Sequence, residues 1–175
     1  MRYVALLRGI NVGGNTMIKM EELRKSFEAL GLENVVSYIN SGNLAFDASS
    51  QGSAKLSRMV EQAIEKDFGK QIPVFTRERP DICRILASNP FAGQFQSHKE
   101  MHVLFLKVEM PTDKQQQLMD AATPPERFAV TGREIYCQLP MGVADSLLGK
   151  SFIEKKLKVA VTGRNWRTVE KLATL

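Results

Sequence analysis

The spacing of hydrophobic residues predicts alternating strands and helices in the first half of the chain. A continuous apolar run at 3–7 is typical of a buried strand, whereas apolar positions three and four apart predict amphipathic helices. Gly31 and Gly69 are suited to end the two helices. The predicted elements are, in order, a strand at 3–7, a helix at 20–30, strands at 35–39 and 44–46, a helix at 56–68 and a strand at 72–75. This β-α-β-β-α-β order is the ferredoxin-like arrangement of two split βαβ units.

The ferredoxin-like arrangement also predicts which strands are neighbours. Its spatial order is strand four, one, three, two, so the fourth strand lies at an edge of the sheet. Pro73 falls within the predicted fourth strand and has no N–H to donate to a neighbour, which favours an edge position.

The second half of the chain repeats this order less clearly. Its predicted elements are a strand at 101–108, a helix from Thr112 with a capping box through Gln115, a hairpin of strands 127–130 and 134–137, helical residues over 143–157, a strand at 159–161 and a last helix from Asn165. A further helix at 81–87 links the halves. The sequence thus predicts an α+β fold with two ferredoxin-like βαββαβ units in tandem, joined by a helical linker, plus a C-terminal helix. We expect the subdomains to span 1–77 and 101–175, with the linker at 78–100.

The loop after the first strand is the first candidate for a binding site. Residues 8–15 read Arg-Gly-Ile-Asn-Val-Gly-Gly-Asn, and a helix begins a few residues later. A glycine-rich loop between a strand and a helix can present unpaired backbone N–H groups to an anion. The loop matches neither GxxxxGK[ST] nor GxGxxG, and its glycines can also serve turn geometry alone. The candidate ligand-binding residues here are Arg8, Gly9, Asn11, Gly13 and Gly14.

The turn between the second and third strands is expected beside this loop. Strands one and two run parallel in the predicted topology, and strand three pairs with strand one. The end of strand one and the turn at 40–43 therefore leave the sheet at the same edge. Asn40, Ser41 and Asn43 join the candidate ligand-binding residues on this ground.

A third candidate segment surrounds the predicted start of the last helix. Asn165 is a good N-cap and Trp166 an apolar anchor, which explains much of the segment structurally. Arg164 and Arg167 would oppose the helix dipole there, so we expect an anion or a carboxylate to compensate them. Arg164, Asn165, Trp166 and Arg167 are therefore candidate ligand-binding residues, and we expect this corner to pack toward the Arg8 loop.

Other chemistry receives little support from the residue pattern. His98 and His102 do not form a zinc motif, and no metal site is predicted. No Ser-His-Asp or Cys-His arrangement identifies a nucleophile, so whether the chain is an enzyme stays open, and no cofactor is indicated. Cys83 and Cys137 are isolated, which favours reduced thiols and a cytoplasmic protein.

The charge balance is compatible with an anionic partner. Lys and Arg total 24 against 19 Asp and Glu, which gives a net charge of +5. The positive residues are spread along the chain rather than gathered in the sharp stripe typical of nucleic-acid binders. No apolar run is long enough to span a membrane, and the oligomeric state is left open.

Three segments resemble a known bacterial family. The runs Leu6–Gly14, Tyr38–Asn43 and Arg164–Thr168 are similar, in this order, to the family catalogued as domain of unknown function 1697. The resemblance implies an α+β fold with ferredoxin-like parts and a cytoplasmic protein. It implies no activity, but it suggests that the three segments form one site.

The leading functional hypothesis is the binding of a small anionic ligand, such as a nucleotide or a phosphorylated metabolite, at the edge formed by the glycine-rich loop and the first hairpin turn. An alternative is a nucleic-acid-binding module, in which Tyr3 and Phe46 would be the aromatic residues of the central strands. A non-catalytic protein-interaction or regulatory domain is the other alternative.

Overall fold

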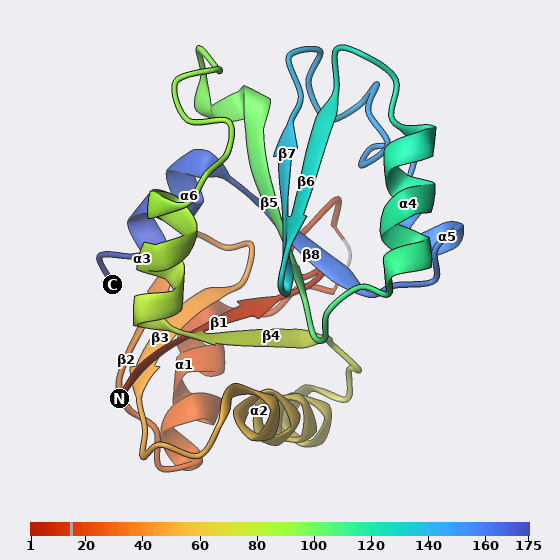
Figure 1. Ribbon diagram of the computed structural model, residues 1–175. Helices are drawn as coiled ribbons and strands as arrows, with labels where there is room; N and C mark the ends of the chain where they lie inside the picture. The colour runs from red at the N-terminus through yellow and green to blue at the C-terminus, as the bar shows by residue number, and fades with distance from the viewer. Residues whose placement is uncertain (15) are drawn as a thin grey trace. The chain divides into compact units, whose positions relative to one another are not determined.

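The computed structural model describes residues 1–14 and 16–175, and it has the α+β fold that the sequence predicts (Figure 1). Asn15, in the predicted glycine-rich loop, lies outside the described residues. The chain forms two compact units, the first from residues 1–84 and 172–175 and the second from residues 85–171. The division falls within the helix that the sequence assigns to the linker, α3 (Arg79–Ala87).

The first unit contains a four-stranded antiparallel sheet in the predicted order. Its elements are β1 (Arg2–Leu7), α1 (Met20–Ala29), β2 (Glu33–Tyr38), β3 (Asn43–Asp47), α2 (Ser53–Phe68) and β4 (Val74–Glu78). The strands are arranged β2-β3-β1-β4, so β4 is an edge strand as expected. The predicted strand at 72–75 in fact begins at Val74, so Pro73 precedes it, and the Pro73 carbonyl accepts a hydrogen bond from the Arg8 N–H at 3.1 Å.

The core of the first unit lies between this sheet and its helices. Figure 1 shows α1 and α2 on the same side of the sheet. Tyr3 and Phe46, directly opposite each other on β1 and β3, stack with ring centroids 5.9 Å apart, and Phe27 of α1 meets Phe46 edge-on at 5.6 Å. All three rings are fully or almost fully buried. The aromatic residues of the central strands therefore fix α1 to the sheet.

The turn between β2 and β3 fits tightly against the end of β1. The Leu7 N–H donates to the Gly42 carbonyl at 2.8 Å. Gly42 has φ +92°, and a Cβ at this position would stand 2.8 Å from the Leu7 Cβ. Only glycine meets both the backbone and the packing requirement here.

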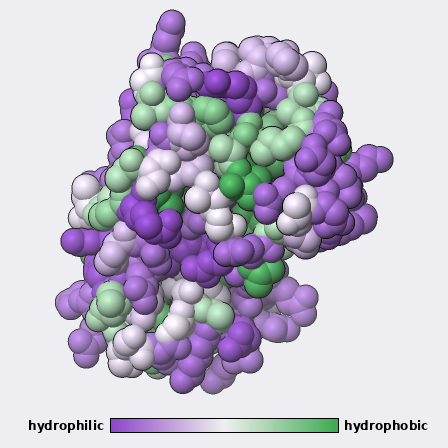
Figure 2. All heavy atoms as spheres, viewed as in Figure 1, coloured by the Kyte–Doolittle hydropathy of each residue, from purple (hydrophilic) through white to green (hydrophobic). Residues whose placement is uncertain are grey.

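The second unit repeats the sheet topology. Its elements are the 3₁₀ helix η1 (His98–Glu100), β5 (Met101–Leu106), α4 (Thr112–Ala121), β6 (Arg127–Thr131), β7 (Glu134–Gln138), α5 (Phe152–Lys155), β8 (Val161–Asn165) and most of α6 (Trp166–Leu172). The strand order β6-β7-β5-β8 matches that of the first unit position by position. Leu118 of α4 and Ile153 of α5 pack with Leu104 of β5 in the core. On the face seen in Figure 2, hydrophilic residues cover α4, and hydrophobic residues gather beside it over β6.

The predicted helix over 143–157 is wrong apart from its last turn, α5. The residues before α5 form turns in which side chains satisfy the backbone. The Ser146 hydroxyl donates to the Val143 carbonyl at 2.6 Å, and the buried Glu126 carboxylate accepts from the Leu147 N–H at 2.9 Å. Such side-chain bonds offer the backbone an alternative to a helix.

Two smaller sequence predictions are also corrected. The helix that includes Thr112 has Pro111 as its N-cap and no side-chain cap bond. The Gln115 side chain donates instead to the Met110 carbonyl at 2.8 Å, so there is no capping box. The strand predicted at 159–161 begins at Val161 and continues to Asn165 as β8.

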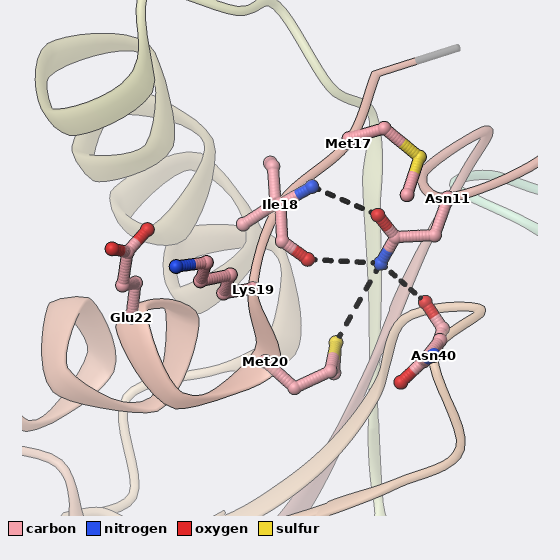
Figure 3. Close-up of a pocket in the computed structure, with 7 residues that line it drawn as sticks. All are labelled: Asn11, Met17, Ile18, Lys19, Met20, Glu22 and Asn40. Carbon is pink, nitrogen blue, oxygen red and sulfur yellow. Dashed lines mark hydrogen bonds between the residues drawn. The ribbon is translucent and has the colours of Figure 1, made fainter. Parts of the chain in front are cut away.

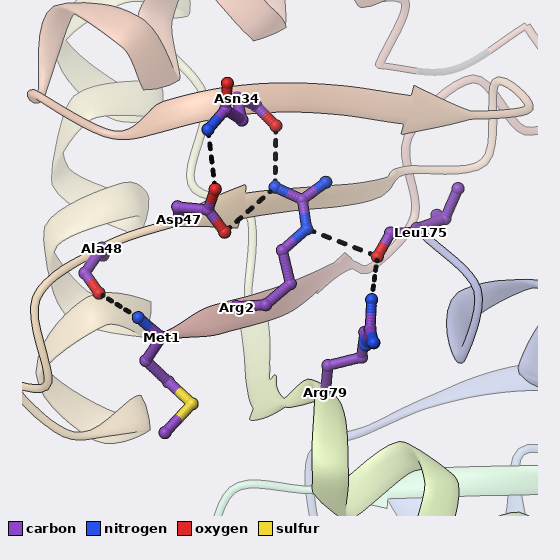
Figure 4. A network of polar contacts seen from close by, with 7 residues as sticks. All are labelled: Met1, Arg2, Asn34, Asp47, Ala48, Arg79 and Leu175. Atoms are coloured by element: carbon purple, nitrogen blue, oxygen red, sulfur yellow. Dashed lines mark hydrogen bonds and ion pairs between the residues drawn. The ribbon is translucent and has the colours of Figure 1, made fainter.

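One polar network ties distant parts of the first unit together (Figure 4). Arg2 donates from Nη1 to the Asn34 carbonyl at 2.8 Å and to the Asp47 carboxylate at 3.3 Å. Its Nε donates to the Leu175 carbonyl at 3.3 Å, and Arg79 reaches the same oxygen at 3.3 Å. The network therefore joins β1 and β3 to residues 172–175, which belong to this unit.

Asp47 should make the first unit sensitive to acid. A hydrogen bond from Asn34 and the charge of Arg2 lower the pKa of its carboxyl below the usual value of 3.8. A lowered pKa in the folded state contributes stability above pH 4 that is lost as the pH falls through the folded-state pKa. We expect Asp47→Asn to reduce the free energy of unfolding at pH 7 and to flatten its decline below pH 4, measured by urea denaturation across pH. Asp145→Asn, at an exposed loop carboxylate, is the control; equal profiles for the two variants would contradict this role of Asp47.

Gly42→Ala should destabilise the fold more than an ordinary glycine replacement. Gly31 also has a positive φ, +82°, but a Cβ there would meet nothing within 4 Å. Gly31→Ala should therefore cost about 1–2 kcal/mol for the backbone conformation alone. Gly42→Ala should cost about 1–3 kcal/mol more, because the added methyl group overlaps Leu7. Equal losses in urea denaturation would show that the turn can move away from β1.

Candidate functional site

The glycine-rich loop and the turn at 40–43 lie side by side at one end of the first sheet, as the topology predicts. Leu6 is opposite Asn43 in the β1–β3 pairing, and Leu7 is hydrogen-bonded to Gly42. Beyond the strands, the Asn11 side chain donates to the Asn40 carbonyl at 2.8 Å. Loop and turn are therefore joined by backbone pairing and by a side-chain bond.

Asn11 organises the loop that leads into α1 (Figure 3). Its side-chain oxygen accepts from the Ile18 N–H at 2.8 Å, and its Nδ2 donates to the Ile18 carbonyl at 3.0 Å as well as to Asn40. Its own N–H donates to the Thr16 carbonyl at 3.1 Å, and its φ is +54°, a conformation that asparagine tolerates better than most residues. Because both ends of the amide are bonded to the backbone, Asn11 shapes the site from within.

A pocket of about 570 Å³ opens between this loop, the start of α1 and the β2–β3 turn (Figure 3). Its lining residues are Asn11, Met17, Ile18, Lys19, Met20, Glu22 and Asn40. This volume lies within the range of small-molecule sites.

The walls of the pocket combine apolar surface with a few polar groups. Met17 is 63% exposed, and Met20 is half-buried beside it in the lining. Lys19 is the N-cap residue of α1, and its side chain accepts no hydrogen bond from the helix. The N–H groups of the first turn are therefore not capped by the side chain of the N-cap residue. Among the described residues, the Asn40 amide has no hydrogen-bond partner and neither Lys19 nor Glu22 has an ion-pair partner. These three side chains are available to a ligand.

Two of the sequence-predicted residues line this pocket, Asn11 and Asn40. Asn43 is fully buried, and its Nδ2 donates to the Tyr38 carbonyl at 3.1 Å and to the Ser41 hydroxyl at 3.2 Å, so it holds the turn together. The remaining candidates of this edge are not among the lining residues: Arg8, Gly9, Gly13, Gly14 and Ser41. Their role as ligand contacts stays a prediction.

The lining residues that the sequence reasoning missed are Met17, Ile18, Lys19, Met20 and Glu22. The glycine pattern points to residues 8–14, whereas most of the pocket lining comes from the segment that closes the loop and begins the helix. The sequence feature that indicates these residues is the mixed apolar and charged run at 17–22, directly before and within the first helical turn.

The C-terminal segment differs from the expectation in one important respect. Arg164 lies within strand β8, directly before the N-cap residue Asn165, and not in the helix itself. It is buried, donates from Nη1 to the Thr162 hydroxyl and the Gly163 carbonyl, both at 2.8 Å, and burial lowers its pKa to about 10. These backbone and hydroxyl acceptors satisfy part of a guanidinium that remains charged at pH 7.

Asn165 and Trp166 have the structural roles that the sequence predicts, whereas the anionic partner expected for Arg167 stays a prediction. The Asn165 side chain accepts from the Thr168 N–H at 3.0 Å and caps α6. Trp166 packs edge-on against Phe95 with centroids 5.9 Å apart, and Arg167 is exposed in the first turn. The segment lies in the second unit and the Arg8 loop in the first, so a shared site for the two stays a prediction.

The histidines and cysteines of the second unit show no catalytic arrangement. Burial, and to a lesser extent His98, lowers the pKa of the His102 imidazole. Cys137 is fully buried, and burial followed by the charge of Glu126 raises the pKa of its thiol well above the usual value. Within residues 1–14 and 16–175, no three His, Cys, Asp or Glu side chains are grouped to hold a metal ion.

Removal of the Asn11 side chain should loosen the loop. Asn11→Ala should lower the free energy of unfolding by about 1–3 kcal/mol, because backbone groups of Ile18 and Asn40 lose their partner. Asn11→Gly loses the same bonds but accepts the positive φ, so it should be about 1 kcal/mol less damaging. Hydrogen exchange of the Ile18 amide should accelerate in both variants. Unchanged protection of that amide would show that Asn11 does not hold the loop.

Comparisons with known proteins agree with this fold. A solved structure titled "The structure of conserved bacterial protein SP0830 from Streptococcus pneumoniae" is similar, with a TM-score of 0.77 and 26% sequence identity over 99% of this chain and 97% of that chain. A comparison with curated proteins finds no match. None of the described helices is long and apolar enough to cross a membrane.

A family model, "Protein of unknown function (DUF1697)", matches residues 1–136. The match includes the glycine-rich loop, the turn at 40–43 and every residue that lines the pocket, whereas Arg164–Arg167 lie beyond it. The chain therefore belongs to the DUF1697 family.

Proposed function

We propose that this protein binds a small molecule through an anionic group in the pocket at the start of α1. The observation that carries the proposal is Lys19, a cation without an ion-pair partner among the described residues, at the N-cap of a helix that opens onto the pocket. A lysine and the N–H groups of a first helical turn are both favourable partners for phosphate or carboxylate oxygens.

The anionic group alone would give weak binding. An anion at an exposed helix N-terminus gains about 0.3–1 kcal/mol, and an exposed ion pair a similar amount. Apolar contact must supply the rest, and Met17, Ile18 and Met20 provide it within the same pocket. A ligand with an organic body behind its acid group, such as a nucleotide or a phosphorylated metabolite, meets both requirements.

The proposal is of binding and not of a reaction. The residues that line the pocket include no serine, cysteine or histidine. Lys19 and Glu22 belong to nucleophile classes, but both side chains are exposed, without the burial that activates a lysine.

The alternative of nucleic-acid binding loses its main support. It depended on Tyr3 and Phe46 as exposed stacking residues on the sheet, but both are fully buried against the helices. Neither ring can accept a base.

Lys19→Met should weaken the binding of anionic ligands. We expect nucleoside monophosphates, sugar phosphates and carboxylates, screened by thermal shift, to include compounds that raise the apparent stability of the protein. For those compounds the dissociation constant should rise about fivefold in Lys19→Met, which corresponds to about 1 kcal/mol for an exposed charge pair. Lys55→Met, at an exposed lysine of α2 outside the pocket, is the matched control and should bind as the parent does. Binding that is insensitive to Lys19, or no stabilisation by any compound, would contradict the proposal.

A further inference from the structure

We infer that the ligand of this pocket carries an ammonium group beside its acid group. This rests on the proposed function and narrows the ligand from any small anion to a compact zwitterion with an apolar body. The chemistry is that of an α-amino acid or of an amino phosphate.

The inference begins with the two opposite charges of the pocket wall. Lys19 and Glu22 are three residues apart at the start of α1, and both line the pocket. Lys19 is the N-cap residue, with an extended backbone, and Glu22 lies in the first turn of the helix. Figure 3 shows their side chains beside each other on one side of the pocket. Among the described residues neither side chain has an ion-pair partner, and both are exposed. The pocket wall thus carries one cation and one anion side by side, as the two charged groups of a small zwitterion require.

The neighbouring turn of the same helix shows that pairing is available to such side chains. Lys25 and Glu21 lie four residues apart on α1 and form an ion pair at 3.4 Å, with both side chains about 70% exposed. Lys19 and Glu22 do not pair in this way. Both side chains line the pocket, and neither neutralises the other in an ion pair.

Glu22 also disfavours a ligand that is only negative. A phosphate monoester carries close to two negative charges at pH 7. Bound at Lys19, it would meet the Glu22 carboxylate at the same wall, and like charges at this distance repel. An ammonium group beside the acid group turns this repulsion into attraction, because Glu22 then has a partner of opposite charge.

The rest of the pocket suits the body of such a molecule. Figure 3 shows Lys19 and Glu22 on one side and Asn11 and Asn40 on the other, with Met20 between them. Methionine side chains adapt to irregular apolar groups. The Asn40 amide, which has no hydrogen-bond partner among residues 1–14 and 16–175, can bind a polar group of the ligand on the opposite side of the pocket. An apolar chain of a few atoms would connect the charged wall to this amide.

Matched probe pairs test the inference. The pairs are L-methionine with its deaminated analogue 4-(methylthio)butanoate, and O-phosphoethanolamine with ethyl phosphate. Binding would be measured by calorimetry and placed by chemical-shift changes of the amides of residues 18–22. We expect the ammonium-bearing member of at least one pair to bind about fivefold more tightly than its partner, the discrimination that a single exposed charge pair supplies. The pair that discriminates tells whether the acid group is a carboxylate or a phosphate.

Variants assign the discrimination to Glu22. In Glu22→Gln the ratio of the dissociation constants of the two probes should fall to about one. Glu28 is an exposed glutamate of α1 outside the pocket, so Glu28→Gln should keep the parental ratio. Glu22→Lys should invert the preference toward the deaminated probe. Both glutamates are exposed, so circular dichroism should show parental folding in each variant.

The two proposals fail separately. Three outcomes would overturn the zwitterion inference. The two probes of each pair bind the parent protein equally tightly, Glu22→Gln leaves the ratio of their dissociation constants unchanged, or neither ammonium-bearing probe binds at millimolar concentration. Binding of the deaminated probes that still depends on Lys19 would then leave the proposed function standing. Binding of anionic probes that Lys19→Met does not weaken overturns the proposed function.

Discussion

The amide of Asn11 is the contact on which the candidate site depends. One short side chain satisfies the N–H and the carbonyl of Ile18 and the carbonyl of Asn40, and so closes the loop and fastens it to the turn. Few residue types can do this, because the position needs a donor and an acceptor on a short stem together with a left-handed backbone. The start of α1 is placed by this closure, and with it the charged wall formed by Lys19 and Glu22.

The sheet supplies the frame on which that closure acts. Antiparallel pairing of β1 with β3 brings the end of one strand to the beginning of the other, and the close fit of Gly42 against Leu7 fixes the turn in place. This part of the site was predictable from the sequence, because the order of apolar segments defines the topology and the topology defines which loops are neighbours. The edge position of β4 followed in the same way.

Other features of the fold and the site could not be predicted, because the local sequence is compatible with more than one structure or because the feature depends on residues distant in the sequence. Both faces of β1 are apolar, so the alternation of residues could not show that Tyr3 points into the core under the helices. Arg164 lies next to a good N-cap residue, and only the pairing of β8 with β5 places it in a strand. The turns before α5 depend on Glu126. Its carboxylate accepts a hydrogen bond from the N–H of Leu147, which lies twenty-one residues away in the sequence. The pocket walls depend on how the loop folds back, which the glycines alone do not reveal.

The membership of residues 172–175 in the first unit has a consequence for how the protein is made. The second unit is inserted into the first, because residues 85–171 separate the two stretches that compose it. Ribosomes add about 5–20 residues per second, so an interval on the order of ten seconds divides the synthesis of these stretches. Throughout this interval the nascent first unit lacks the Leu175 carbonyl that Arg2 and Arg79 share. The sheet of the first unit can form early, but its polar network is completed only after the whole inserted unit has been synthesised.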